Sequence, residues 1–356
     1  MTKSKNTKIL VALSGGVDSS VAAALLINQG YDVTGAFMVN YDGEKKPGES
    51  CWHGDYQDAL RVAAHLGIPL IRLDFIQEYK KFVLEYLYKQ YAAGRTPNPD
   101  VMCNKFVKFG FWLKSAEKLG FDYLATGHYA NIKKDKDGKI KLMCAKDRNK
   151  DQTYFLHQLK QRQLRKILFP IGKYTKPEVR QLAQKFHLPT AQKEESMGIC
   201  FVGEVSMRDF LQDKIKYESG DIINTSGEKV GTHDGLPFYT IGERGLNLSD
   251  SKGQPYFVIA KDIKKNILIV GRADDPKLFQ QETVVKNVNW ISGQKPKLPL
   301  KCQVRMRHRQ MLVNCILKKK GRSLIVKFSQ PERAITPGQF AVFYKGKECL
   351  GGGEIK

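Results

Sequence analysis

Apolar and polar positions follow two different patterns along the first 130 residues. Short apolar runs predict buried strands, and the segments between them, with apolar residues at helical spacing, predict helices. The expected strands are residues 9–13, 33–39, 70–73 and 123–126, and the expected helices are residues 20–29, 55–66, 75–93 and 106–119. Strands separated by helices predict an α/β fold with a doubly wound parallel sheet. Ligands of such sheets bind beyond the carboxyl ends of the strands.

The pattern changes near residue 205, after two further expected helices at 151–168 and 176–186. Beyond this point, short strand-like segments are separated by turn-forming pairs such as Asp234-Gly235. We therefore predict three domains. They are a catalytic α/β domain over residues 1–205, a small central β domain over residues 206–272 and a basic C-terminal β-barrel over residues 276–356.

The segment Ser14-Gly15-Gly16-Val17-Asp18-Ser19 joins the first expected strand to the first expected helix. Such a turn directs backbone N–H groups and the positive end of a helix dipole at one point, which suits a pyrophosphate. Asp18 would repel a bare phosphate, so we expect Mg²⁺ beside it. No Gly-Lys-Ser/Thr follows, so this is not a Walker loop. The alternative is a glycine-rich turn without a ligand.

The charge of the chain is large and unevenly distributed. The formal net charge is +23, and residues 276–356 carry 17 Lys and Arg against 4 Asp and Glu. This excess predicts a polyanionic partner, most simply nucleic acid, and the alternative is charge that serves solubility alone. No apolar run approaches the roughly 20 residues of a membrane span, and the basic start lacks the apolar core of a secretory signal. We expect a cytoplasmic protein that has no membrane partner.

The cysteine pattern excludes two common uses of cysteine. There are seven cysteines and no Cys-x-x-Cys pair. An odd number in a reducing compartment argues against a disulfide framework, and the spacing argues against zinc or cluster sites. We therefore predict no metal-ligating residues. Five cysteines are interpreted as structural, with the role of Cys51 left open: Cys51, Cys144, Cys302, Cys315 and Cys349.

The two remaining cysteines lie in segments that favour chemistry. Cys103 lies in a loop stiffened by two prolines, Arg95–Asn104. The loop ends at an expected helix start, which would lower the pKa of this thiol. It is a candidate nucleophile, with Asp100 as a candidate acid or base. The alternative is a rigid loop with an ordinary small residue. Cys200 stands in Gly198-Ile199-Cys200-Phe201, after an acidic approach that suggests it is accessible.

A third segment suits phosphate contacts. In Arg305-Met306-Arg307-His308-Arg309, alternate residues of an expected strand over 303–309 would place three arginines on one face. Arginines in such an array suit several phosphates. The alternative is a solvated, charged strand face. The amide of Gln339, after the turn Pro337-Gly338, could contact a base edge.

Several of these segments together resemble the bacterial tRNA-specific 2-thiouridylases, which belong to the ATP pyrophosphatases. The resemblance covers nearly the whole chain in order. It rests on the Ser14–Ser19 segment, Gly94–Asp100 with Cys103-Asn104, Ala125–Tyr129, Lys150–Leu156, Gly198–Phe201 and Thr336–Gln339.

The resemblance implies a set of site residues. ATP would be bound by Ala12, Leu13, Ser14, Gly15, Gly16, Val17, Asp18, Ser19, Met38 and Gly127. The target base would be handled by Asn98, Pro99 and Asp100. Cys103 would be the nucleophile and Cys200 the carrier of a persulfide. The remaining contacts to tRNA would come from His128, Lys150, Asp151, Gln152, Arg307, His308 and Gln339.

The resemblance also implies the reaction, which is ATP-dependent 2-thiolation of the wobble uridine of tRNAs for Lys, Glu and Gln. The base would be adenylated, AMP and pyrophosphate would leave, and the Cys200 persulfide would deliver sulfur. Cys103 would either release the sulfur by attack on the persulfide or close a disulfide with Cys200. A sulfur-relay protein or cysteine desulfurase would supply sulfur, and a monomer is expected.

Two other interpretations remain open. One is a pyrophosphatase-type ligase for a small molecule or another tRNA base, such as a lysidine or 4-thiouridine synthase. It does not account for the pair Cys103 and Cys200 with the loop at Asn98. The other is a non-catalytic RNA-binding protein with a degenerate nucleotide loop, which intact Asp18, Cys103 and Cys200 argue against.

Overall fold

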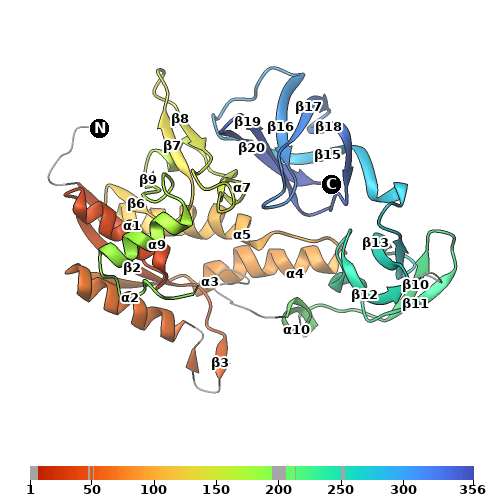
Figure 1. Ribbon diagram of the computed structural model, residues 1–356, viewed down its shortest axis with the longest axis horizontal. Coiled ribbons are helices and arrows are strands. Elements are labelled where there is room, and N and C mark those ends of the chain that lie inside the picture. The colour runs from red at the N-terminus through yellow and green to blue at the C-terminus, as the bar shows by residue number, and fades with distance from the viewer. Residues whose placement is uncertain (1–6, 47–48, 51, 195–205, 213, 250–252) are drawn as a thin grey trace.

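The computed structural model of the protein describes residues 7–46, 49–50, 52–194, 206–212, 214–249 and 253–356. Figure 1 shows an N-terminal α/β body, a barrel above and to the right of it, and a small β body at the far right. The predicted fold class, a doubly wound parallel sheet followed by a small β domain and a β-barrel, is confirmed. Among the described residues, no helix is long and apolar enough to cross a membrane.

The N-terminal sheet has five parallel strands in the order β5-β2-β1-β6-β9. They are β1 (Lys8–Ala12), β2 (Asp32–Val39), β5 (Leu70–Asp74), β6 (Tyr123–Ala125) and β9 (Ile167–Leu168). Alternate residues of a strand face opposite sides of the sheet. Accordingly, Leu10 packs in one core cluster, and Ile9 and Val11 pack in another. The sheet is therefore buried on both faces, as the apolar runs predict.

Helices cover both faces of this sheet. Helices α1 (Val17–Asn28) and α2 (His53–Leu66) pack on the Ile9 side. On the Leu10 side lie two long helical rods, each with a π-helical segment in it. The first rod is α3 (Ile76–Tyr79), Lys80–Leu84 and α4 (Glu85–Ala92); the second is α5 (Pro99–Met102), Cys103–Trp112 and α6 (Leu113–Lys118). Helix α9 (Lys176–Lys185) packs against α1.

The second rod begins earlier than the sequence predicts. Asn98 caps it, since its side chain accepts a hydrogen bond from the Val101 N–H at 3.3 Å, and Pro99 occupies the first helical position. The expected helix over 106–119 therefore starts at residue 99. Cys103 lies one turn inside the helix, not at its start.

The expected helix over 151–168 is wrong. The segment forms two short helices, α7 (Thr153–Leu156) and α8 (Gln161–Leu164), and then strand β9. The carbonyls of His157 and Leu159 accept hydrogen bonds from Nδ2 of Asn289 in the barrel, at 2.9 and 3.0 Å. Long-range bonds thus replace the intrahelical bonds that the periodicity predicts.

The small β body is a five-stranded sheet in the order β11-β10-β14-β13-β12. Its strands are β10 (Gly220–Asn224), β11 (Lys229–His233), β12 (Arg244–Ser249), β13 (Pro255–Asp262) and β14 (Ile267–Gly271). Leu87 and Tyr91 of α4 pack with Leu211 of α10 (Met207–Gln212) and with Phe238 beside this sheet. Helix α4 thus reaches from the α/β body to the small β body (Figure 1).

The C-terminal barrel closes through pairing of its first and last strands, β15 and β20. Its strands are β15 (Phe279–Trp290), β16 (Leu300–Arg305), β17 (Val313–Lys320), β18 (Ser323–Arg333), β19 (Phe340–Lys345) and β20 (Glu348–Ile355). The hairpin of β7 (Asn131–Lys134) and β8 (Ile140–Met143) extends this sheet by pairing with β20. A second short hairpin is formed by β3 (Glu44–Lys46) and β4 (Glu49–Ser50). The β7–β8 hairpin, which precedes residue 205 in the chain, thus belongs to the barrel sheet, and the parallel sheet is separate from it.

Candidate active site

The Ser14–Ser19 loop joins β1 to α1 and is held by bonds within itself. The Ser14 N–H donates to Oγ of Ser19 at 3.2 Å, and the Ser19 hydroxyl donates to the Gly16 carbonyl at 3.1 Å. Gly15 has φ +72°, and a Cβ there would lie 2.3 Å from the Asp55 carbonyl oxygen. The second observation explains why glycine is required at this position. The loop leaves the N-terminal N–H groups of α1 directed at one place, as an anion site needs.

Asp18, in the same loop, has a counter-charge that the sequence does not reveal. Lys176 Nζ at the start of α9 lies 2.7 Å from its Oδ1, and the Tyr129 hydroxyl donates to the same oxygen at 2.9 Å. The only sequence signal nearby is the capping box of Thr175 and Glu178, which marks a helix start but no partner for Asp18. Lys176 and Tyr129 are therefore site residues that sequence reasoning missed.

The carboxyl ends of β1, β2 and β6 gather the other expected ATP residues. A Cβ on Gly127 would lie 2.7 Å from the backbone nitrogen of Ser19, so the segment after β6 is pressed against the loop. Met38 is buried near the end of β2 in the same core cluster as Ala12. The structure thus brings the loop and Gly127 together, and it places Met38 inside the neighbouring core.

His128, an expected tRNA contact, is 8% exposed. Its Nδ1 lies 2.8 Å from Oγ1 of Thr126, and its ring packs against Phe109 and Phe169. Burial, together with the positive charge of Lys108, holds the pKa of His128 well below its usual range. The imidazole is therefore neutral at pH 7.

The second expected site segment is the base loop, Arg95–Asp100, which leads into α5. Cys103 directly follows α5 and is 1% exposed, and Asp100 is half-buried one turn earlier. The side chain of Gln339, at the end of the turn before β19, donates to the Thr96 and Pro97 carbonyls of this loop at 3.0 and 3.1 Å. Base loop and barrel are thus in direct contact. Cys200 and Cys51 lie outside the described residues.

Two members of the segment Lys150-Asp151-Gln152 point into the protein. Asp151 is 2% exposed and accepts hydrogen bonds from the Ala145 N–H at 3.1 Å and the Thr153 hydroxyl at 2.8 Å. Oε1 of Gln152 accepts a bond from the Tyr129 N–H at 2.8 Å. Lys150 is half-buried.

The expected row of three arginines on one strand face is wrong. Strand β16 ends at Arg305, and Arg309 has φ +65°, so the chain turns within this segment. Arg305 is buried against Asp151 at 3.2 Å. Arg307 Nη2 donates to the carbonyls of Ile241 and Ala334, both at 2.8 Å. These two guanidinium groups join the bodies of the protein because buried charges require partners.

His308 lies on the same turn. With Arg305 and Arg307 it makes contacts between the bodies of the protein, and these contacts are called the joint below. Its Nε2 is 3.3 Å from the Asp151 carbonyl oxygen, and its ring centroid is 4.4 Å from that of Phe155. Burial lowers the pKa of His308 from its ordinary value. The side chains of Arg307 and His308 therefore contact the protein itself at the place where tRNA contacts were expected.

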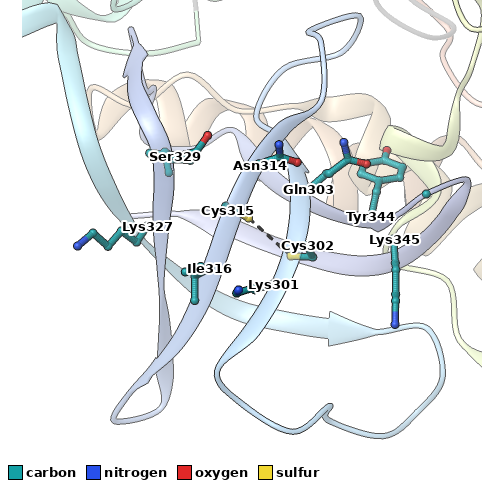
Figure 2. Close-up of a pocket in the computed structure, with 12 residues that line it drawn as sticks. Lys301, Cys302, Gln303, Asn314, Cys315, Ile316, Lys327, Ser329, Tyr344 and Lys345 are labelled. Atoms are coloured by element: carbon teal, nitrogen blue, oxygen red, sulfur yellow. Dashed lines mark hydrogen bonds between the residues drawn. The ribbon is translucent and has the colours of Figure 1, made fainter.

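A hollow of about 460 Å³ lies in the barrel, across β16 to β19. Figure 2 shows the side chains that line it. Cys302 and Cys315 face each other there, with their sulfur atoms 3.6 Å apart. The hydrogen bond to Cys302, aided by burial, raises the pKa of the Cys315 thiol. Both positions agree with the interpretation of these cysteines as structural. Polar side chains around the hollow include Lys301, Gln303, Asn314, Lys327, Ser329 and Lys345.

Comparison with known proteins identifies the family. The chain is 46% identical over 355 residues to the tRNA-specific 2-thiouridylase MnmA of Lacticaseibacillus paracasei, covering 98% of this chain and 94% of that protein. It is 45% identical over 360 residues to the enzyme of the same name from Streptococcus mutans, covering 100% and 96%. The chain belongs to the tRNA-specific 2-thiouridylase family. The resemblance inferred from the motifs is thereby confirmed.

Three family models match along the chain. They are the tRNA methyl transferase HUP domain over residues 7–204, the tRNA methyl transferase PRC-barrel domain over 208–272 and the aminomethyltransferase beta-barrel domain over 280–355. Methyltransferase is a word in these model names, whereas the full-length relatives are named thiouridylases. A solved U34-tRNA thiolase NcsA from Methanococcus maripaludis covers 58% of this chain and 64% of its own at 20% identity. Its TM-score against this chain is 0.35.

Proposed function

We propose that this protein thiolates position 2 of the wobble uridine in tRNAs for Lys, Glu and Gln, with consumption of ATP. Membership of its family makes the chain a tRNA-uridine 2-sulfurtransferase. The observation that carries the proposal is the relatives' match over the full length of the chain, with both the Ser14–Ser19 loop and the base loop present. The tRNA would be a partner of the C-terminal part, where the positive charge is concentrated.

The ATP site is proposed at the carboxyl ends of β1 and β6. The N-terminal N–H groups of α1 and the hydroxyls of Ser14 and Ser19 suit the pyrophosphate, and residues 12–19 with Met38 and Gly127 form its surroundings. Mg²⁺ fits this donor set, because Asp18 supplies a carboxylate oxygen and the serines supply hydroxyls. A bound Mg²⁺ would supply positive charge that stabilises the departing pyrophosphate. Lys176 offers a second positive charge at the same carboxylate.

The proposed chemistry proceeds in two stages. The C2 oxygen of uridine attacks the α-phosphorus of ATP, which turns a poor leaving group into AMP. A persulfide on Cys200 then transfers its outer sulfur to C2, and the C2–O bond breaks. The thiolate of Cys103 attacks the inner sulfur of the persulfide, either before the transfer, so that sulfide is released and attacks C2, or after the outer sulfur has bonded to C2. Both routes leave a Cys103–Cys200 disulfide, which a thiol reductant must reduce before the next turnover. The base has to leave the anticodon stack to enter a pocket between the loops.

Residues 1–205 would perform the chemistry, and the central and C-terminal domains, over 206–272 and 276–356, would hold the tRNA. Asn98, Pro99 and Asp100 are the proposed base contacts, with Asp100 as acid or base. Other tRNA contacts are proposed among His128, Lys150–Gln152 and Arg307-His308. Because several of these side chains are bonded internally, such contacts require them to exchange partners. A sulfur-relay protein or cysteine desulfurase would deliver sulfur to a cytoplasmic monomer.

The proposal is tested by incubating the protein with unmodified tRNA, ATP, Mg²⁺ and a persulfide source. Mass spectrometry of the nucleosides should detect 2-thiouridine, and AMP should form in equal amount. Cys103→Ala and Cys200→Ala should abolish thiolation, whereas Cys302→Ser, a matched change in the barrel, should retain it. AMP release without thiolation would indicate another acceptor. Bound tRNA with neither product would favour an RNA-binding protein without catalysis.

A further inference from the structure

Both the nitrogen and the oxygen of the Gln339 side-chain amide have hydrogen-bond partners. Its Nε2 donates to the Thr96 and Pro97 carbonyls, at 3.0 and 3.1 Å. Its Oε1 lies 3.4 Å from Nδ2 of Asn98 and 3.4 Å from the Tyr154 hydroxyl. An amide nitrogen carries two hydrogens, and two carbonyls use both of them. The opposite orientation would place Oε1 against two carbonyl oxygens, which only accept, so the orientation is determined.

The base loop cannot make these bonds by itself. Pro97 and Pro99 have no N–H group, so the loop lacks two of the backbone donors that usually stabilise a turn. Two of its other restraints also come from distant residues. The Thr96 N–H donates to the Pro337 carbonyl at 3.0 Å, and the Thr96 hydroxyl donates to the Thr240 hydroxyl at 3.3 Å.

The backbone of Gln339 and its neighbour Gly338 is anchored in the barrel. Its carbonyl accepts a bond from the Ile355 N–H at 2.8 Å, and the Gly338 N–H donates to the Ile355 carbonyl at 3.1 Å. Gly338 has φ +93°, and a Cβ there would lie 2.9 Å from the Thr96 carbonyl oxygen. The turn before β19 is thus shaped to lie directly against the base loop.

The restraint on the base loop also affects the position of Asp100 and Cys103, the residues proposed for the chemistry. Asn98, beside Oε1 of Gln339, caps the helix that starts at Pro99. Asp100 lies in the first turn of that helix and Cys103 in the next. The position of Asn98 therefore determines where the helix starts and the direction in which both side chains leave it.

We propose that Gln339 is a positioning residue: from the barrel, it fixes the base loop and through it Asp100 and Cys103. This inference rests on the proposed function. It differs from a role for Gln339 as a contact that reads tRNA, since both of its donors are used by the loop. The barrel then forms part of the active site in addition to holding tRNA.

The test compares Gln339→Ala and Gln339→Glu with Asn289→Ala. Glutamate has the shape of glutamine but has no N–H to offer the two carbonyls. Asn289 is the matched control, because its amide also donates to two carbonyls of the α/β body, those of His157 and Leu159, away from the base loop. Both Gln339 variants should lower kcat for thiolation about tenfold or more at saturating tRNA, since small misplacements of reacting groups have such effects. The Kd for tRNA should change less than about twofold in all three variants.

A readout that does not need activity is the alkylation of Cys103 by iodoacetamide, followed by mass spectrometry of its peptide. Cys103 is 1% exposed, so loosening of the base loop should speed its alkylation about threefold or more in the Gln339 variants. Asn289→Ala should lower the melting temperature by a similar amount with neither effect. A tenfold higher Kd for tRNA with unchanged kcat and alkylation would overturn the positioning role. If no protein, including wild type, makes 2-thiouridine, the proposed function fails while alkylation still decides this inference.

Discussion

The two loops proposed for chemistry are held in opposite ways. The backbone of the Ser14–Ser19 loop is restrained by hydroxyl and backbone groups at most five positions apart in sequence, and the distant residues Lys176 and Tyr129 bind the side chain of Asp18. The base loop has local bonds at its two ends, and its middle is restrained by Thr240, Pro337 and Gln339, which are more than 140 positions away. The first conformation follows from a short stretch of chain once β1 and α1 have formed. The second exists only when the three bodies have assembled.

This difference separates two functions of the molecule. Damage to the joint between the bodies should weaken thiolation more than ATP binding. Damage inside the first loop should do the reverse. In order of decreasing effect, two predictions test the stability of the contacts between the bodies, and a third tests whether the two loops are independent.

The largest effect is expected from Arg305→Leu. Arg305 and Asp151 form a buried pair whose side chains are 10% and 2% exposed, and loss of the cation leaves the carboxylate buried without its counter-charge. Such a loss costs about 3–5 kcal/mol of unfolding free energy, measured by urea denaturation. The control is Arg61→Leu, because Arg61 is 64% exposed in its ion pair with Asp58, and its loss should cost less than about 1 kcal/mol. Equal costs in the two variants would show that the joint does not depend on this pair.

The second largest effect is expected from a fall in pH, which should destabilise the contact between α7 and the barrel. His157 is fully buried between α7 and the barrel, and burial lowers its pKa from 6.5 to about 4. Its neutral form is present in the folded protein, whereas the unfolded chain binds a proton below pH 6.5. Stability is therefore complete above pH 6.5 and is lost as the pH falls towards 4, by about 3 kcal/mol for this residue.

The measurement is denaturant unfolding at several pH values between 7 and 4. His157→Gln should flatten the decline, since the substituted side chain does not titrate. Buried His128 should leave part of the decline in place. The same slope in wild type and His157→Gln would contradict the assignment.

The smallest effect is expected from Ser19→Ala. The change removes the hydroxyl that accepts a hydrogen bond from the Ser14 N–H and donates one to the Gly16 carbonyl. This loss should destabilise the loop by about 1 kcal/mol. ATP affinity should fall about fivefold in equilibrium binding, with Cys103 alkylation unchanged. Ser292→Ala is the control, because Ser292 makes the same two kinds of bond with Gln294 in an exposed turn. Faster alkylation in Ser19→Ala would show that the two loops are not independent.

The sequence alone predicted what depends on local order. Apolar runs and helical spacing predicted the parallel sheet, and the two adjacent glycines predicted the turn between β1 and α1, where Gly15 has φ +72°. The family also followed from short motifs that keep their order along the chain. The strands, the helices and this turn are set by neighbours in sequence, so periodicity and motif spacing reveal them. That the strands pair in parallel follows from their alternation with helices.

Tertiary structure decided the features that depend on distant partners. The helix expected over 151–168 is broken because Asn289 takes its carbonyls, and the expected arginine face is lost because Arg305 and Arg307 find acceptors in other bodies. Lys176 reaches Asp18 across 158 positions, and Gln339 reaches Thr96 across 243. Polar groups leaving water must find partners wherever the fold supplies them. Sequence spacing does not encode that choice, since it is made only when the bodies pack together.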